Sequence, residues 1–498
     1  MKLGVDEYLS IPVIKVYNTL SSRLEEFKPI KDNIVKMYVC GPTVYDSMHV
    51  GHARTYVAFD IIRRYLEHRG YKVFMVINIT DIDDKIINRA NELGKSWDEI
   101  VSYYTKDFFK CLETLNIRSV YAFPRVTEHI SDIINLVQAL MSKGYAYLAD
   151  DGSIYFSIDK VKDYGILSGQ RLESLIAGAR VEVNPYKRNP LDFALWKAWK
   201  PKEPWWSSPW GPGRPGWHIE CVAMSVKYLG VRFDIHGGGQ DLVFPHHENE
   251  LAIAKAYLGS NAFARYWLHT GLVTIKGEKM SKSLGNIIPL EELLKKYNEE
   301  VLRLYLASVH YRKPLDFKFE VLDQYREVLN TLYTAHDYLI SILRDRTLEL
   351  YELSTPTTTN NFESKIIDKI NLAVSEFEES MSNDFNTPQA LSALIKLAKI
   401  CINISSSEEQ LSDSLLLYAY GKLKSLSNVF GVLSHRMPPI DIEKLIYKAI
   451  GILIEVRSEL RKRKLWELSD KMRSELNKMG IVVSDLKTKS LWRWQRNI

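Results

Sequence analysis

Two short motifs in the sequence combine residue types that can bind phosphate. The first, His49-Val50-Gly51-His52, lies between an expected strand and an expected helix. Free backbone N–H groups at a helix N-terminus attract phosphate, and a glycine there lets a flat ring approach the backbone closely. Two histidines near a helix start also occur as capping or core residues, so this motif alone leaves both interpretations open.

The second motif is KMSKS at 279–283, followed by Leu284-Gly285-Asn286. Two lysines in a loop of small residues suit a mobile clamp on a polyphosphate leaving group, because cations stabilise charge that develops in the transition state. A solvated loop is the alternative. The two motifs together, about 230 residues apart, are far more specific. They form the signature of class I aminoacyl-tRNA synthetases, and this chain resembles that class.

The elements around the first motif indicate a parallel α/β unit. Residues 37–46 are expected to form a buried strand that runs into a turn, 53–70 a helix that stops at Gly70, and 71–80 the next strand. Ligands of such a unit gather at the carboxyl ends of the strands. Further predicted elements are a hairpin at 146–158, strands at 233–239 and 266–275, and helices beyond about residue 290, interrupted by a loop at 354–361.

Longer segments resemble one family within the class, the cysteinyl-tRNA synthetases. They are CGPTVYD (40–46), NITDIDDKI (78–86), RPGWHIEC (214–221), FDIHGGGQDLVFPHHENE (233–250), EKMSKSLGN (278–286), MSNDFNTPQAL (381–391) and MRSELNKMGIVV (472–483). The resemblance implies a ligase that makes cysteinyl-adenylate and pyrophosphate from L-cysteine and ATP with Mg²⁺. It then transfers the cysteinyl group to the 3′ end of tRNA(Cys).

The resemblance also implies one Zn²⁺ per chain, held by Cys40, Cys221, His246 and Glu250. All four are acceptable zinc ligands by type. In the bare sequence only His246 and Glu250 have ligand-like spacing, four apart on one helical face. Each of the two cysteines taken alone would be interpreted as a small core residue. His247 is a local rival for His246, and the register of the family favours His246.

Other roles follow from the resemblance residue by residue. The residues assigned to ATP binding are His49, Gly51, His52, Asp241, Lys279, Ser281 and Lys282, and those assigned to catalysis are His49, His52, Lys279 and Lys282. The residues assigned to the cysteine pocket are Gly41, Thr80, Trp217 and His236. Catalysis would consist of positioning and charge stabilisation, without a nucleophile from the protein. Cys111 and Cys401 match no motif and are interpreted as structural.

The predicted fold class is α/β: a Rossmann-like catalytic domain with a parallel sheet, split by an insertion and followed by a helical bundle and a small C-terminal domain. The predicted borders are 1–13 for an N-terminal extension, 14–123 for the first catalytic half, 124–212 for the connective insertion, 213–250 for the second half with the zinc site, 251–322 for the KMSKS connector, 323–436 for the bundle and 437–498 for a basic anticodon-recognition domain. No function is assigned to 1–13 or to 345–362.

Composition and charge limit the class of protein further. A hydrophobic fraction of 46% with 26% charged residues is that of a globular protein, and no apolar run approaches the ~20 residues of a membrane span. The four cysteines are scattered, and the first residues lack the apolar core of a signal peptide. Both features fit a cytoplasmic protein. We expect a monomer without a membrane partner.

The basic excess of the chain is concentrated at its end. Residues 457–498 contain twelve Lys/Arg and five Asp/Glu, whereas the whole chain carries a net charge of +5. Such an end is expected to contact a polyanion such as tRNA. A solvated helix face without a partner is the alternative.

Two other functions compete with this interpretation. One is a related ligase that activates cysteine but transfers it to an amino sugar. Such relatives lack the tRNA-reading end, whereas this chain continues for more than 200 residues after KMSKS. The other is a zinc-dependent RNA-binding module with an inactive site, which the intact HVGH and KMSKS motifs disfavour.

Overall fold

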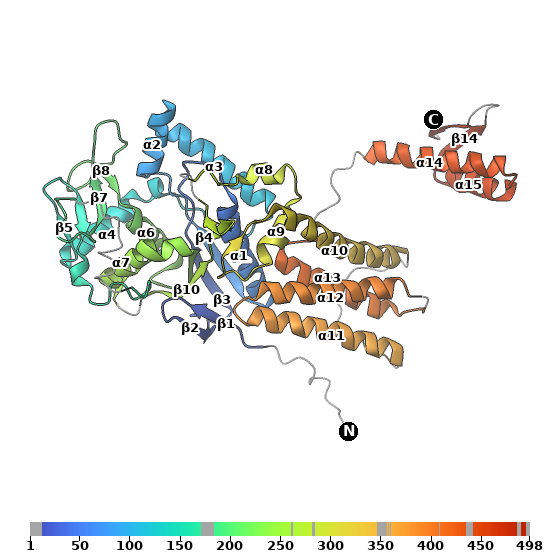
Figure 1. Cartoon of the computed structure of the whole chain (residues 1–498), viewed down its shortest axis with the longest axis horizontal. Helices are drawn as coiled ribbons and strands as arrows, with labels where there is room; N and C mark the ends of the chain where they lie inside the picture. The colour runs from blue at the N-terminus through green and yellow to red at the C-terminus, as the bar shows by residue number, and fades with distance from the viewer. Residues whose placement is uncertain are drawn as a thin grey trace, which may run out of the picture. The chain divides into compact units, whose positions relative to one another are not determined.

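The computed structural model describes residues 12–170, 184–259, 262–280, 284–345, 356, 358, 360–407, 409–434, 442–485 and 490–494. The chain forms two compact units, residues 1–433 and residues 434–498. Figure 1 shows the elements of each unit. None of the helices in the described ranges is long and apolar enough to cross a bilayer.

A four-stranded parallel sheet forms the centre of the first unit, in the order β10-β9-β3-β4 (Figure 1). Its strands are β3 (Ile34–Val39), β4 (Lys72–Ile77), β9 (Arg232–Gly239) and β10 (Phe263–Thr270). β3 and β4 are mainly apolar and the last three residues of each are buried, as expected for strands that are covered on both faces. The predicted parallel strand–helix–strand unit is confirmed.

Hydrophobic cores cover the two faces of this sheet. Side chains alternate along β3, so Met37 and Val39 join the core that contains α1 (Val50–His68), while Tyr38 and Cys40 join the core that contains α6 (Trp217–Leu229) and α7 (Glu248–Leu258). α1 connects β3 to β4, as the sequence predicts. Two further helices, α2 (Asp84–Leu93) and α3 (Trp97–Thr114), follow β4.

An antiparallel sheet interrupts the parallel one in the chain. Its order is β5-β6-β7-β8, and its strands are β5 (Ala146–Leu148), β6 (Ile154–Phe156), β7 (Phe193–Ala198) and β8 (Gly213–Pro215), preceded by α4 (Ile130–Ser142). β5 and β6 are the predicted hairpin. β8 leads directly into α6, so the inserted sheet is continuous in sequence with a wall of the parallel sheet domain.

A small connector and a helical bundle complete the first unit. The connector consists of β11 (Val273–Ile275), β12 (Glu278–Lys279), β13 (Leu315–Asp316), α8 (Leu290–Leu294) and α9 (Glu299–Ala307). The bundle consists of α10 (Phe319–Asp345), α11 (Asn361–Ser382), α12 (Thr387–Ser405) and α13 (Asp413–Phe430) (Figure 1). A hairpin of β1 (Lys15–Asn18) and β2 (Arg23–Glu26) precedes the parallel sheet. The predicted loop at 354–361 lies largely outside the described residues.

A buried ion cluster attaches the bundle to α1. Asp60 accepts hydrogen bonds from Arg63, Arg64 and Arg303, and the Asp60 and Arg303 side chains are both 0% exposed. Arg303 also donates to the backbone carbonyl of Phe430 at 2.8 Å. Burial would raise the pKa of Asp60, but Arg303, Arg64 and Arg63 lower it to about 2, so its carboxylate stays charged.

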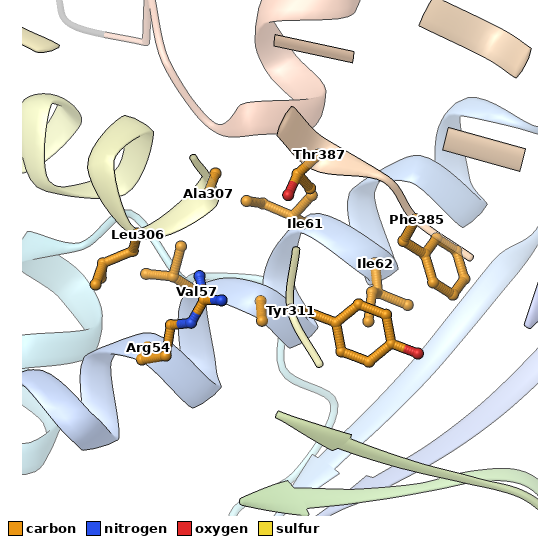
Figure 2. Close-up of a pocket in the computed structure, with 10 residues that line it drawn as sticks. Arg54, Val57, Ile61, Ile62, Leu306, Ala307, Tyr311, Phe385 and Thr387 are labelled. Atoms are coloured by element: carbon orange, nitrogen blue, oxygen red, sulfur yellow. The ribbon is translucent and has the colours of Figure 1, made fainter. Parts of the chain in front are cut away.

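A small internal cavity lies beside α1, near the start of α12 (Figure 2). Its lining is mainly apolar and includes Val57, Ile61 and Phe385. The volume is about 10 Å³, which is at the lower limit for a single water molecule. It is a packing defect and not a ligand site.

The second unit contains α14 (Ile442–Lys462), α15 (Trp466–Lys478) and an antiparallel hairpin of β14 (Ile481–Asp485) and β15 (Ser490–Trp494). Its core is small and includes Ile450, Ile454, Leu476, Ile481 and Val483. The second unit is therefore a compact body with a core of its own.

Candidate active site

A cavity of about 810 Å³ lies at the carboxyl edge of the parallel sheet. Segments that follow β3, β4 and β9, the start of α1 and the β11–β12 region line it. Of the site residues predicted from the sequence, those that line the cavity are Cys40, Gly41, His49, Gly51, His52, Thr80, Trp217, Cys221, Asp241, His246 and Lys279. A concave site of this size can hold a nucleotide and a small second substrate.

The HVGH motif caps α1. His49 Nδ1 accepts hydrogen bonds from the backbone N–H groups of Gly51 (3.1 Å) and His52 (3.4 Å), and His52 Nδ1 accepts one from the N–H of His49 (3.3 Å). Because both Nδ1 atoms accept, each neutral ring carries its hydrogen on Nε2. The two rings stack with centroids 3.7 Å apart. The capping and phosphate-binding interpretations are thus compatible: the rings cap the helix and also line the cavity.

The described part of the KMSKS motif lies opposite HVGH. A Cβ atom on Gly51 would lie 2.9 Å from His49 Cε1 and 3.4 Å from Met280 Cε, so the glycine makes room for the His49 ring and lies beside the second motif. Lys279 Nζ lies 3.7 Å from Asp241 Oδ2, which places the predicted phosphate-binding lysine beside the predicted ribose-binding acid. Ser281 and Lys282 lie outside the described residues.

Close backbone packing builds the predicted cysteine pocket. A Cβ atom on Gly41 would lie 1.5 Å from the carbonyl oxygen of Asn78, so no larger residue fits. The Gly41 N–H donates to Asn78 Oδ1 (2.8 Å), and Asn78 Nδ2 donates to Thr80 Oγ1 (3.2 Å). Thr80 in turn lies 3.5 Å from the buried carboxyl group of Glu220. The segments after β3 and β4 therefore form one wall of the pocket.

Trp217 forms the opposite wall. Its ring stacks on His246 with a centroid separation of 4.3 Å and an interplanar angle of 28°. Trp217 is the first residue of α6, where the chain leaves the inserted sheet. An indole in this position gives the pocket an apolar surface directly beside one of the predicted metal ligands.

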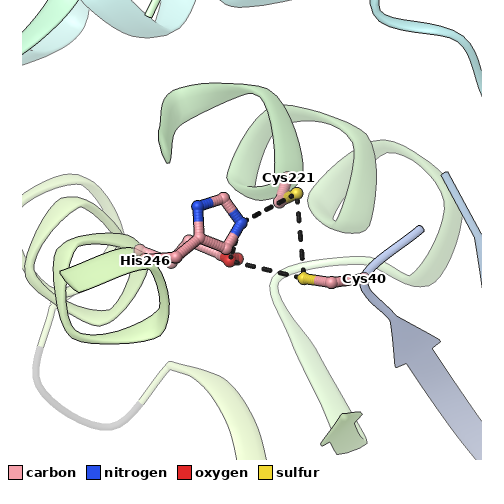
Figure 3. Close-up of side chains that lie close together, drawn as sticks. Cys40, Cys221 and His246 are labelled. Carbon is pink, nitrogen blue, oxygen red and sulfur yellow. Dashed lines mark hydrogen bonds and ion pairs between the residues drawn. The ribbon is translucent and has the colours of Figure 1, made fainter. Parts of the chain in front are cut away.

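Four buried donor groups converge at the base of the cavity. Ligand atoms of Cys40, Cys221, His246 and Glu250 all lie within 4.8 Å of one another. Figure 3 shows the Cys221 sulfur joined by dashed lines to the His246 ring and to the Cys40 sulfur. Cys221 Sγ lies 3.9 Å from Cys40 Sγ and 3.5 Å from His246 Nε2, and His246 Nε2 lies 2.9 Å from Glu250 Oε1. The donor types and their convergence fit a zinc ion.

The charge of this cluster also suits a cation. The hydrogen bond from the Cys40 thiol lowers the pKa of Cys221 to about 6, despite burial. Burial would raise the pKa of Glu250, but His236 and His246 hold it well below its usual range. The site therefore presents a thiolate and a carboxylate at neutral pH. Buried charges of this kind are normally paired or coordinate metals.

His247, the predicted rival of His246, belongs to a second possible ligand set. Its Nε2 atom lies 3.2 Å from Cys40 Sγ, and the second set consists of Cys40, His236, His247 and Glu250. The side chains of His236 and His247 do not line the cavity, whereas Cys40, Cys221 and His246 do. Three members of the first set line the cavity, whereas only Cys40 of the second set does, so the first set is better placed to present a metal ion to a substrate there.

His236 does not line the cavity. It was assigned to the cysteine pocket, but it is 0% exposed and its Nε2 donates to Glu250 Oε2 at 2.7 Å. It stacks on Trp267 behind the ligand cluster. The reason is that His236, like its register partner Tyr38, lies on the face of the sheet that packs against α6 and α7. Its contact is with a predicted metal ligand, whose orientation it can fix, and its assignment to the cysteine pocket stays a prediction.

Several cavity residues are not singled out by the sequence. Asn78 and Lys85 line the cavity and lie within the quoted segment NITDIDDKI, so the resemblance could have identified them. His269 lies behind His247, with His247 Nδ1 2.8 Å from His269 Nε2. A single histidine on a strand carries no local signal. Cys111 and Cys401 are buried in the hydrophobic core, as predicted.

Comparison with known proteins agrees with this geometry. Residues 26–327 match the family described as tRNA synthetases class I (C) catalytic domain, and residues 376–434 match the DALR domain. The cysteine–tRNA ligase of Pyrobaculum arsenaticum is 48% identical over 97% of this chain and 99% of its own length. The cysteine–tRNA ligase of Saccharolobus solfataricus is 47% identical over 97% of this chain and 99% of its own length.

Solved structures of the same class share the fold at low sequence identity. A methionyl-tRNA synthetase of Mycobacterium tuberculosis in complex with methionyl-adenylate matches with a TM-score of 0.56 and 16% identity, over 80% of this chain and 89% of the other. The LeuRS–tRNA–LeuAMS complex of Agrobacterium radiobacter K84 matches with a TM-score of 0.61 and 12% identity, over 81% and 84%. By its motifs, its fold and its full-length relatives, the chain belongs to the cysteine–tRNA ligase family of class I aminoacyl-tRNA synthetases.

Proposed function

We propose that this enzyme recognises the thiol of its amino-acid substrate through a zinc ion held by Cys40, Cys221, His246 and Glu250. The observation that carries the proposal is that three of these four donors line the cavity while their ligand atoms converge. A zinc ion bound there supplies a soft coordination position for the thiolate of cysteine. Trp217 and Thr80 line the same cavity, which supports a cysteine pocket beside that position.

Selection of cysteine over serine requires such a contact. The two amino acids differ only by SH and OH, and a shape difference of this size contributes ~1–3 kcal/mol. A discrimination of 10⁴ needs about 5.5 kcal/mol. A thiol with a usual pKa of ~8.5 is readily deprotonated by a metal, whereas a hydroxyl is far less acidic. Coordination therefore supplies the missing discrimination without a separate editing site.

The ATP site is proposed at the other end of the cavity. The two Nε2–H groups of His49 and His52 are suited to donate to phosphate oxygens, and Lys279 supplies a cation in the same region. Asp241 is suited to accept hydrogen bonds from ribose hydroxyls. ATP enters with Mg²⁺, as phosphate substrates commonly do. These residues bind and orient the triphosphate, and Lys282 is proposed to neutralise the leaving pyrophosphate.

The second unit is proposed to contact tRNA near the anticodon. The basic run Arg461-Lys462-Arg463-Lys464 spans the end of α14, and the Arg461 guanidinium lies 5.3 Å from the centroid of the Trp466 ring. Trp466 is 51% exposed. An exposed ring among cations can stack on an unpaired base while the cations hold phosphates. This chemistry favours tRNA over an amino sugar as the acceptor of the cysteinyl group.

The test is cysteine-dependent ATP–pyrophosphate exchange combined with metal analysis. The intact enzyme is expected to contain about one zinc per chain, and Cys221→Ser and His246→Ala are expected to lose most of it. In both variants the cysteine affinity should fall sharply while ATP binding is largely preserved. Zinc-edge X-ray absorption should show an added Zn–S contact at ~2.3 Å when cysteine binds. A fully active enzyme without metal would refute the proposal.

A further inference from the structure

Two adjacent residues at the start of α2 contact different parts of the molecule. Asp84 is the first residue of the helix and Lys85 the second. Asp84 Oδ1 accepts a hydrogen bond from Arg214 Nη2, and its Oδ2 accepts one from Lys197 Nζ. Lys197 lies on β7 and Arg214 on β8. One carboxylate beside the parallel sheet therefore holds two neighbouring strands of the inserted sheet.

This clamp is charged and partly buried. The Arg214 side chain is 2% exposed, and its Nε also donates to Glu203 Oε2 at 2.9 Å. Burial would raise the pKa of Asp84, but Lys197 and Arg214 lower it to about 2. Hydrogen bonds between ionised partners are shorter and stronger than neutral ones. The Asp84 carboxylate is therefore ionised at neutral pH and pairs with both cations.

The clamped strand leads directly into the cysteine pocket. β8 ends at Pro215, and the Gly216 N–H donates to the carbonyl of Leu195 at 2.9 Å. A Cβ atom on Gly216 would lie 1.9 Å from the carbonyl oxygen of Ala194, so the chain is pressed against β7 at this point. Trp217 follows immediately. Its backbone position is thus determined by the inserted sheet that Asp84 holds.

The neighbouring residue, Lys85, contacts Trp217 directly. Its Nζ lies 5.7 Å from the Trp217 ring centroid and 5.6 Å from that of Tyr45. No carboxylate among the described residues pairs with Lys85, and a cation in the first turn of a helix opposes the helix dipole. Helix stability therefore does not explain this lysine. Its contacts are the two aromatic rings at the wall of the cavity.

We propose that Asp84 and Lys85 are positioning residues for the amino-acid substrate: Asp84 fixes the strand that carries Trp217, and Lys85 holds the indole over the cysteine pocket. The contacts form a closed path from Asp84 to Arg214, along the chain to Trp217, and across to Lys85. The first turn of α2 thereby connects the inserted sheet to the cysteine pocket. This inference rests on the proposed role of Trp217 in the cysteine pocket.

The test compares KM values for cysteine and for ATP in pyrophosphate exchange by the zinc-loaded, full-length enzyme. Asp84→Asn and Lys85→Gln are each expected to raise the KM for cysteine about tenfold, the size of a typical coupling between contacting residues, with the KM for ATP within about twofold of wild type. Lys85→Arg keeps a cation over the ring and is expected to restore the wild-type KM. Asp163→Asn removes another ion pair of the inserted segment, the one with Lys255. It is the matched control and is expected to change neither KM value.

Variants in a Trp217→Phe background distinguish positioning from loss of structure. If Asp84 and Lys85 act through the indole, their substitutions should add little to the KM of Trp217→Phe. Full additivity in that background, or equal changes of both KM values, would overturn the inference. An unchanged cysteine KM in Trp217→Phe itself would instead refute the proposed pocket. The two failures are therefore separable.

Discussion

The Nε2 atom of His236 lies 2.7 Å from Oε2 of Glu250, and neither side chain is exposed to solvent. This pair fixes the orientation of the one carboxylate in the proposed zinc site, because the other oxygen, Oε1, faces His246 at 2.9 Å. Partners of metal ligands typically contribute 10–100-fold to metal affinity. Loss of the His236 ring should therefore be measurable as a decrease in zinc affinity.

His236→Ala is expected to weaken zinc binding about 10–100-fold while leaving the four ligands in place. Competition with a chromophoric chelator measures the affinity directly. His336→Ala removes a histidine that pairs with Asp337 on the surface of α10 and serves as the control. Unchanged zinc affinity in His236→Ala would show that Glu250 is oriented by other contacts.

Zinc loading is expected to release protons and to tighten as pH rises. Burial lowers the pKa of His246, but Glu250 and Cys221 raise it to about 10 in the metal-free site. The ring is thus protonated at pH 7 and must lose that proton to coordinate. Proton competition falls as pH rises toward 10, so the apparent affinity increases in that direction. Calorimetric titration in buffers of different ionisation enthalpy counts the released protons, and a count of zero would contradict the assignment of His246.

Lys282→Ala is expected to reduce the rate of adenylation about 10²–10³-fold, the size typical of a lost contact to developing charge. Cysteine affinity should change little, because the lysine is proposed to act on the leaving pyrophosphate. Single-turnover adenylate formation separates the two quantities. Lys296→Ala, at an exposed lysine of the connector, is the control. A rate within a few-fold of wild type would remove Lys282 from the mechanism.

Removal of residues 434–498 is expected to spare pyrophosphate exchange and to weaken tRNA charging. This segment is a compact unit with its own core, so its loss leaves the described contacts of the cavity intact. Replacing Lys462, Arg463 and Lys464 with Gln should weaken charging in the intact chain and reduce its salt dependence. Normal charging by the truncated enzyme would show that this unit does not contribute to tRNA binding.

Asp60→Asn is expected to destabilise the enzyme by about 3–5 kcal/mol, because it leaves buried Arg303 without its carboxylate. The folded pKa of Asp60, about 2, lies below its usual value of 3.8. The stabilisation is therefore fully present above about pH 4 and is lost as pH falls toward 2. Chemical denaturation measures both effects. Asp323→Asn, which removes an exposed pair with Arg326, should change stability by less than about 0.5 kcal/mol.

Local patterns in the sequence predicted the elements that position the site. The apolar run of β4 and the apolar spacing of α1 are local properties, so both elements could be recognised directly. The same holds for His246 and Glu250, which are four residues apart and in contact at 2.9 Å. Spacing alone therefore indicated these two residues as possible metal ligands, with His247 as a rival that only the family register set aside.

The rest of the site depends on contacts between distant segments. Cys40 and Cys221 are 181 residues apart, and only the family resemblance connected them. The contact of His236 with Glu250 depends on which face of β9 carries the histidine. A single histidine in a strand does not indicate that face. The clamp between Asp84 and Arg214 joins residues 130 positions apart, and no motif links them.

The separation of the donors in the chain also has a consequence for biosynthesis. Cys40 and Glu250 are 210 residues apart. At a typical synthesis rate of ~5–20 residues per second, Cys40 is added to the chain roughly 10–40 seconds before Glu250. During that interval the Cys40 thiol lacks the other donors of the cluster. The proposed zinc site is therefore completed late and cannot guide the early folding of β3.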